Sequence, residues 1–113
     1  MLFAMTSPSR GPWHDRRIIV AGGTSGFGLV LARHLFRGGA RVLLVGRSNE
    51  GVRQGLAACD PDGDAGDSHR LRGIAADLER DGEGGRVVGE ALAHWRGVDD
   101  LFFCVGRSGR RTI

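Results

Sequence analysis

The chain of 113 residues contains no tyrosine and only two cysteines, and all 16 of its basic residues are arginine. The absence of lysine excludes a P-loop, because that motif needs a lysine to reach the phosphates. Cys59 and Cys104 provide neither a disulfide framework nor metal-ligand spacing, so we expect no metal site. The apolar stretch at residues 2–5 is too short for a signal-peptide core or a membrane span. These absences favour a cytoplasmic location.

The charge balance is moderately basic, with a formal net charge of +3, which raises the question of nucleic-acid binding. The arginines are scattered among aspartate and glutamate residues, however, and they cluster only at Arg107, Arg110 and Arg111. No stretch combines basic and aromatic residues into a stacking platform. We therefore expect no nucleic-acid partner. The proportions of 41% hydrophobic and 26% charged residues predict one small globular domain.

Hydrophobic periodicity divides the chain into two parts. Residues 1–15 show none and are predicted to form a flexible leader, whereas strand-like and helix-like segments alternate from residue 16 onward. The predicted strands cover residues 16–21, 41–45, 71–75 and 101–105, and the predicted helices cover residues 26–38, 48–58 and 83–96. This alternation predicts an α/β fold over residues 16–113, a doubly wound parallel sheet of the Rossmann-like, dinucleotide-binding kind.

The same periodicity predicts which helix residues are buried against the sheet. In the first helix these residues are Phe27, Val30, Leu31 and Leu35. In the third helix they are Val87, Val88, Ala91, Leu92 and Trp95.

The segment Ala21-Gly22-Gly23-Thr24-Ser25-Gly26-Phe27-Gly28 lies between the first predicted strand and the first predicted helix. A strand that ends in a glycine turn and leads into a helix is typical of a phosphate-binding site. Small residues let the backbone approach a pyrophosphate, and the helix N-terminus offers unpaired N–H groups. The alternative is a glycine-rich turn without a ligand. A G-x-G-x-x-G pattern starting at Gly26 fails at Leu31, and a hydrolase G-x-S-x-G pattern starting at Gly23 fails at Phe27.

The spacing of these glycines resembles the T-G-x-x-x-G-x-G turn of the short-chain dehydrogenase/reductase family, and the resemblance extends over residues 16–106. The chain departs from the family at Ala21, where the family usually has threonine, whose hydroxyl helps to fix the turn. The resemblance implies an oxidoreductase fold that binds NAD(P). It also implies that the cofactor pyrophosphate is lined by Gly22, Thr24, Ser25, Gly26, Phe27 and Gly28.

The second predicted strand ends at Gly46-Arg47-Ser48, where the cofactor's adenosine ribose is expected. Arg47 lies about 20 residues beyond the last glycine of the turn, where an acidic residue selects NAD and an arginine accepts the 2′-phosphate of NADP. A guanidinium suits that dianion because its planar fork gives paired, charge-assisted hydrogen bonds. We predict that NADP is preferred to NAD, with Arg47 and Ser48 at the cofactor. The alternative is that Arg47 is one more solvated arginine.

Two further segments complete the resemblance. Asp77 and Leu78 follow the third strand, where the family has an aspartate and an apolar residue at the adenine ring; Asp77 could instead be an N-cap of the following turn. The family's N-N-A-G segment corresponds to residues 103–106, so Val105 and Gly106 are expected at the cofactor ribose. Both amide side chains of that segment are absent, which removes the hydrogen bonds that steady it.

The chemistry of the family needs a Ser, a Tyr and a Lys, and the chain has no Tyr and no Lys. We therefore assign no catalytic residue and expect the chain to be a fragment, the N-terminal cofactor-binding portion of an NADP-dependent oxidoreductase. That enzyme would transfer a hydride between NADP(H) and a carbonyl or alcohol substrate. The alternatives are a non-catalytic NADP or nucleotide sensor, and a structural partner module. The apolar fourth strand, residues 101–105, is expected to form an exposed edge that an oligomer or partner chain would cover.

Overall fold

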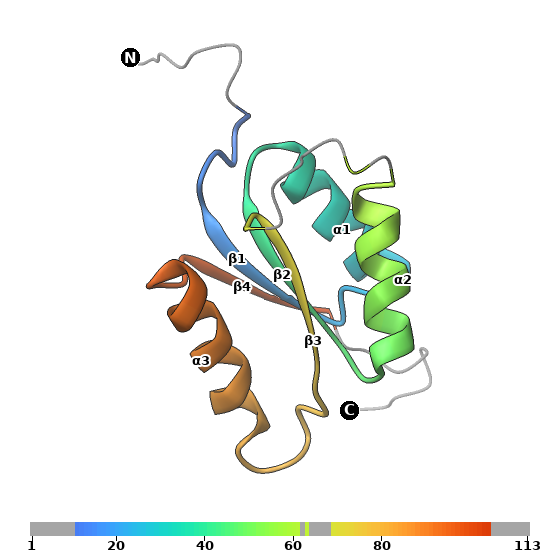
Figure 1. Cartoon of the computed structure of the whole chain (residues 1–113), viewed down its shortest axis with the longest axis vertical. Coiled ribbons are helices and arrows are strands. Elements are labelled where there is room, and N and C mark those ends of the chain that lie inside the picture. Colours follow the sequence, from blue (N-terminus) through green and yellow to red (C-terminus); the bar gives the residue numbers. More distant parts are fainter. Residues whose placement is uncertain (1–10, 62, 64–68, 105–113) are drawn as a thin grey trace.

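The computed structural model describes residues 11–61, 63 and 69–104. Strands and helices alternate in the order β1 (Arg17–Ala21), α1 (Gly26–Arg37), β2 (Arg41–Gly46), α2 (Asn49–Cys59), β3 (Leu71–Ala75), α3 (Glu83–Trp95) and β4 (Asp100–Phe103). All strand pairs are parallel, and the sheet order is β3-β2-β1-β4. Helices α1 and α2 cover one face of the sheet and α3 covers the other (Figure 1). The predicted doubly wound α/β fold is confirmed.

Strands β1 and β2 form the centre of the sheet and are buried on both faces. Ile18 pairs with Val42 and Val20 pairs with Leu44 in register, and all four side chains are fully buried. A continuous run of β-branched and aliphatic residues is what a parallel strand between two helical layers requires. The apolar pattern thus fixes the position of both strands in the interior.

Alternate residues of these strands contribute to two separate hydrophobic clusters. The cluster under α1 and α2 consists of Ile18, Val20, Ala32, Leu35, Phe36, Ala40, Val42, Leu44 and Cys59. The cluster under α3 consists of Ile19, Ala21, Leu43, Val45, Ala76, Val87, Ala91 and Trp95. Each cluster fills one layer between helix and sheet, as the two-residue side-chain period of a strand dictates.

The predicted inner face of α1 is partly wrong. Leu35 is buried, but Phe27 and Val30 are 73% and 66% exposed. The helix instead approaches the sheet through Gly28, Ala32 and Phe36, because its first turn must lie close to the glycine turn that precedes it. The close approach of α1 to the sheet therefore requires the smallest residue, Gly28, on the buried side of its first turn.

The predicted inner face of α3 is also partly wrong. Val87, Ala91 and Trp95 are buried as expected, whereas Val88 and Leu92 are 41% and 48% exposed. A spacing of three to four residues marks an apolar stripe. Val88 and Leu92 lie at the side of this stripe, where the described part of the sheet does not cover them.

Residues 11–15, the described part of the predicted leader, form a turn against the end of α1. The amides of Trp13 and Asp15 donate to the carbonyls of Gly38 and Gly39, at 3.1 and 2.9 Å. The Trp13 ring packs on the cluster under α1 and α2. Residues 1–10 lie outside the described residues.

The amino-terminal end of the sheet is held by side chains from distant parts of the chain. The Arg17 guanidinium donates to both carboxylate oxygens of Asp99, at 3.0 and 3.1 Å, and to the carbonyl of Trp95 at 3.3 Å. The indole of Trp95 in turn donates to the carbonyl of His69 at 2.7 Å. The hydrogen bonds from Arg17 hold the pKa of the Asp99 carboxyl well below its usual range. These contacts connect the starts of β1 and β4 to the end of α3.

Candidate functional site

The candidate site lies at the carboxyl ends of the strands, where the sheet order reverses on either side of β1. The turn after β1 is anchored to both neighbouring strands. The Cys104 amide donates to the Ala21 carbonyl at 2.7 Å, and the Gly22 amide donates to the Val45 carbonyl at 2.9 Å. In open α/β sheets this reversal point is where ligands bind. The topology therefore brings the glycine turn to the expected place.

Two glycines of the turn have different structural roles. A Cβ atom on Gly28 would lie 1.9 Å from the carbonyl oxygen of Gly22, so only glycine allows α1 to start this close to β1. Gly26 has φ +57°, and among the described residues no atom lies within 4 Å of the position that a Cβ would occupy. Gly28 thus brings helix and strand together, while Gly26 leaves open space at the helix start.

The N-terminus of α1 is suited to an anion. Its N-cap residue, Ser25, is extended, and its side chain makes no capping hydrogen bond. Among the described helices, α1 alone has neither a side-chain cap nor an acidic residue in its first turn; α2 begins with Glu50 and α3 with Glu83. The N–H groups of a first turn have no partner within the helix and carry partial positive charge. A phosphate group supplies both the acceptors and the charge that they lack.

Thr24 and Phe27, two residues predicted to line the pyrophosphate, differ in their surroundings. The Thr24 side chain packs against Gly46 at the end of β2, and its backbone lies beside Gly55 of α2. Thr24 therefore joins the turn to the neighbouring strand and helix. Phe27, in contrast, is exposed beside the open helix start.

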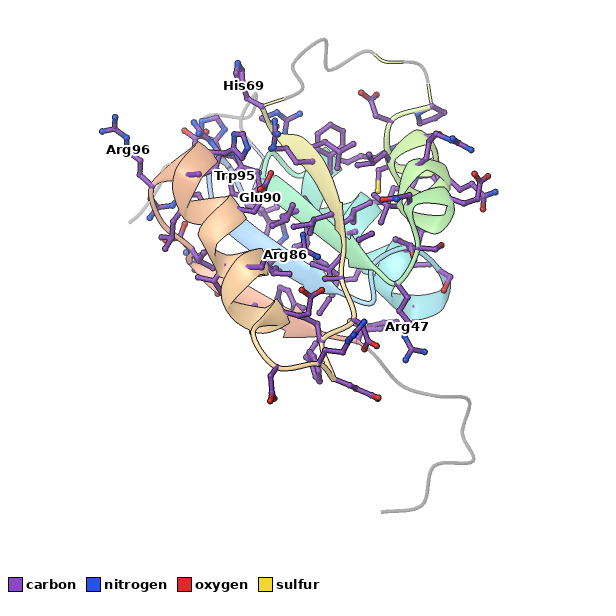
Figure 2. All side chains as sticks on the ribbon, turned by 60° about the horizontal axis from the view of Figure 1, so that its bottom comes forward. Arg47, His69, Arg86, Glu90, Trp95 and Arg96 are labelled. Atoms are coloured by element: carbon purple, nitrogen blue, oxygen red, sulfur yellow. The ribbon has the colours of Figure 1, made fainter. Side chains whose placement is uncertain are left out.

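Arg47 and Ser48 follow β2 at the same edge of the sheet. The Arg47 side chain is 66% exposed, and its Nη2 lies 3.9 Å from Oδ1 of Asp77. Ser48 is the N-cap of α2, and its hydroxyl accepts from the Gly51 amide at 3.0 Å. Figure 2 shows Arg47 at the end of the molecule opposite His69 and Trp95. The structure therefore brings the predicted Arg47 and Asp77 together and uses the hydroxyl of Ser48 to begin a helix.

Asp77 and Leu78 follow β3 in a turn that precedes α3. Oδ1 of Asp77 accepts from the Glu79 amide at 3.1 Å, so Asp77 caps this turn, while α3 itself has Gly82 as its N-cap. The Leu78 side chain packs on the cluster under α3. The remaining two predicted site residues, Val105 and Gly106, lie outside the described residues.

Glu83 and Arg86 also contribute to this region, although neither residue is among the predicted site residues. Oε1 of Glu83 accepts from the backbone amide of Asp77 at 3.3 Å, and Arg86 donates to the carbonyl of Ala75 at 2.6 Å. The hydrogen bonds from Arg86 lower the pKa of the Glu83 carboxyl. The three-residue spacing of these opposite charges on a predicted helix was the only available signal, and it does not reveal a contact with a strand.

Three further features of the described part of the chain concern metal binding, cysteine reactivity and membrane insertion. No group of three His, Cys, Asp or Glu residues there could hold a metal ion. Burial raises the pKa of the Cys59 thiol to about 11, so this group is a protonated core residue and not a nucleophile. Within the same residues, every helix is too short or too polar to cross a membrane.

The fold and the glycine turn match known proteins. A family model described as short chain dehydrogenase matches residues 16–113. The chain is 31% identical over 97 residues to human dehydrogenase/reductase SDR family member 2, mitochondrial, covering 86% of this chain and 33% of that protein. It is 32% identical over 97 residues to 3-ketodihydrosphingosine reductase ksrA of Aspergillus fumigatus, covering 84% of this chain and 26% of that protein.

A solved structure extends this comparison. The C-domain, with NADP, of a bacterial malonyl-CoA reductase has a TM-score of 0.80 at 22% identity, covering 88% of this chain and 16% of that chain. A likeness at this level of identity concerns the fold. The chain spans about a third or less of the length of the curated relatives that it matches.

Proposed function

Because the chain belongs to the short-chain dehydrogenase family, we propose that it binds NADP at the carboxyl ends of β1 and β2. The observation that carries this proposal is the N-terminus of α1, which has neither a side-chain cap nor an acidic residue in its first turn and no described atom within 4 Å of a Cβ on Gly26, at the same sheet edge as the exposed guanidinium of Arg47. The first feature suits a pyrophosphate, and the second suits a phosphate on the adenosine ribose. Two anion sites at one sheet edge fit a dinucleotide with a 2′-phosphate.

Different residues would hold different parts of the cofactor. The backbone around Ser25, Gly26 and Phe27 would hold the pyrophosphate, and Arg47 would hold the 2′-phosphate. Asp77 would lie at the adenine. When bound, NADP(H) supplies a hydride that passes between its nicotinamide and a carbonyl or alcohol carbon.

Substrate contacts and proton transfer are not assigned to any residue, since the chain has no tyrosine and no lysine. We propose that this part of the protein grips the cofactor, and that the substrate is held by a further part of the polypeptide or by a partner. Leu101 and Phe103 of β4 are 59% and 65% exposed at the edge of the described sheet. An apolar edge strand of this kind is a surface that a partner chain or a second copy would cover.

A second candidate is a nucleotide sensor without catalysis. Such a sensor needs only the glycine turn and Arg47, both of which lie in the described residues, whereas hydride chemistry needs a proton donor as well. The sensor and the oxidoreductase portion share one binding site. They differ in whether nicotinamide reduction occurs, which absorbance of the reduced cofactor reports directly.

Nucleotide-dependent stabilisation tests the proposed binding. Thermal unfolding of the purified chain is followed alone and with NADP, NAD or AMP, each at the same concentration. A ligand that binds only the folded state stabilises it by about 2.7 kcal/mol at 100 times its dissociation constant. We expect the largest rise in unfolding temperature with NADP. An unchanged midpoint with all three nucleotides would contradict the proposed function, and equal rises with NADP and NAD would contradict the preference alone.

We also propose a cytoplasmic location. Cys59 and Cys104 are both free, which suits a reducing compartment. Fractionation of cells that express the chain tests this, and recovery from an oxidising compartment would contradict it.

A further inference from the structure

The turn between β3 and α3 is fixed by one ion pair with unusual connections. Arg86 donates two hydrogen bonds of 3.0 Å to Glu83, from its Nε to Oε2 of the carboxylate and from its Nη2 to Oε1. Each partner also bonds the backbone of the strand end: Glu83 accepts from the Asp77 amide, and Arg86 donates to the Ala75 carbonyl. Figure 2 shows Arg86 on the side of the molecule that carries α3. The pair therefore holds two points of the chain on either side of Ala76.

The strand end that this pair holds is connected to Arg47. The Ala76 amide donates to the Gly46 carbonyl at 2.8 Å, and Gly46 directly precedes Arg47. On the other side, Oδ1 of Asp77 faces Nη2 of Arg47 at 3.9 Å. A shift of the Ala75–Asp77 backbone would move the carboxylate that lies beside this guanidinium. The Arg47 side chain is 66% exposed, and a long exposed side chain loses rotamer freedom when it binds a ligand unless a neighbour already restricts it.

The first turn of α2 contains an ordinary pair for comparison. Glu50 and Arg53 have the same three-residue spacing, and their side chains are hydrogen-bonded, with Gln54 as a further donor to Glu50. The hydrogen bonds that Glu50 accepts from Arg53 and Gln54 stay within the helix, whereas Arg86 reaches the carbonyl of a residue 11 positions earlier. Helix stabilisation accounts for the first pair but not for the bond between Arg86 and β3.

We propose that Glu83 and Arg86 are positioning residues for the cofactor's adenosine 2′-phosphate end. The pair, named here the Glu83–Arg86 clamp, holds Asp77 in place, and Asp77 in turn preorients Arg47. This proposal rests on the proposed NADP binding. A preformed site loses less freedom on binding, so the clamp raises affinity without touching the ligand.

Variants of the 113-residue chain test the clamp. Arg86→Met and Glu83→Gln remove one charge each, and Arg53→Met is the matched control for the loss of a helical ion pair. Isothermal titration gives the dissociation constants for NADP and for adenosine 2′,5′-bisphosphate, and amide hydrogen exchange reports protection of the Asp77 N–H. We expect both clamp variants to bind each ligand about tenfold more weakly and to exchange Asp77 faster. The Arg53→Met control should bind like the unmutated chain. Arg86→Lys keeps the charge but not the planar fork, and it should recover part of the affinity.

Each outcome decides between explanations. Equal affinity of all variants would overturn the clamp and leave the proposed function standing. An equal loss in Arg53→Met and Arg86→Met would also overturn it, because general helix destabilisation would then suffice. If the unmutated chain bound neither ligand, both the proposed function and the clamp's role in binding would be contradicted. Hydrogen exchange at the Asp77 amide would still show whether the ion pair holds the turn.

Discussion

The two ends of the parallel sheet use their polar groups in different ways. At the amino-terminal end, Arg17 is bonded to Asp99, and Arg16 pairs with Asp100 at 2.8 Å, so the charges are satisfied within the molecule. At the carboxyl end, α1 begins without a cap and the guanidinium of Arg47 is largely exposed. One end joins strands and helices to each other. The carboxyl end also joins α3 to β3 through the Glu83–Arg86 clamp, but it leaves the start of α1 and the Arg47 guanidinium available for a ligand.

This difference separates stability from binding along the axis of the sheet. Groups whose hydrogen bonds are made internally contribute to folding, while unpaired donors at a surface are held ready without stabilising the fold. Substitutions at the carboxyl end should therefore change ligand affinity more than stability. Substitutions at the amino-terminal end should do the reverse. Gly28 and the Glu83–Arg86 clamp are exceptions. Gly28 lies in the binding turn and is also buried between helix and strand, and the clamp joins α3 to the end of β3.

Gly28→Ala is expected to have the largest effect. The new methyl group would lie 1.9 Å from the Gly22 carbonyl oxygen, a backbone atom that cannot rotate away. Overpacking of this kind costs about 3 kcal/mol. We expect a loss of that size in the free energy of unfolding, measured by denaturant titration, together with loss of NADP binding.

Gly26→Ala is the control for Gly28→Ala. No atom of the described residues lies within 4 Å of a Cβ at this position, so the strain expected from them is that of the positive φ, at a cost of about 1–2 kcal/mol. Its methyl group would occupy the space proposed for the phosphate, so it should remain folded and still lose affinity for NADP. A Gly26→Ala variant that binds NADP normally would place the phosphate elsewhere.

Arg47→Ala is expected to affect binding selectively. Loss of a charged hydrogen-bonding partner should weaken NADP binding by about 1.5–3 kcal/mol, or roughly tenfold to more than hundredfold, and leave Asp77 facing the 2′-phosphate. NAD lacks that phosphate, so its affinity should change little. Competition titrations with both nucleotides measure the ratio. Arg53→Ala removes a similarly exposed arginine from α2 and should leave the ratio unchanged. A similar loss in both variants would show that Arg47 acts only through general charge.

The sequence was sufficient to predict those features that depend on neighbouring residues. The apolar run of β2 and the glycine turn before α1 are local patterns, and both lie where they were predicted. The burial of Gly28 and exposure of Phe27 were not predictable in this way, since periodicity does not show how close a helix must approach the strand before it. The spacing of apolar residues identifies an apolar stripe on a helix, whereas tertiary packing determines which residues of that stripe are buried.

The ion pairs illustrate the same limit more strongly. Arg17 and Asp99 are 82 residues apart, and they meet only because β1 and β4 are paired in a particular register. The contact of Arg86 with Ala75 depends on where α3 crosses the end of β3. Neither pair has a sequence signature beyond opposite charge. Such contacts become visible only when the strand order and register are known.

Asp99→Asn is expected to have the smallest effect, confined to stability. Asparagine keeps an acceptor for the Arg17 amide but removes the charge that the guanidinium faces. We expect a lower unfolding temperature at neutral pH and a dissociation constant for NADP that stays within about twofold of the unmutated value. A large loss of affinity would contradict the separation of stability and binding between the two ends of the sheet.

The pH dependence of this variant gives the sharpest check. Arg17 lowers the pKa of Asp99 in the folded protein, so its contribution is fully present above the ordinary aspartate pKa of about 3.9 and is lost as the pH falls toward the folded-state value. Asp99→Asn has no such group to protonate. The difference in unfolding temperature between the two proteins should therefore narrow from about pH 6 to about pH 3. Glu83 is present in both proteins and cancels from the comparison, so a difference that stays constant with pH would show that the Arg17–Asp99 charge pair does not stabilise the fold.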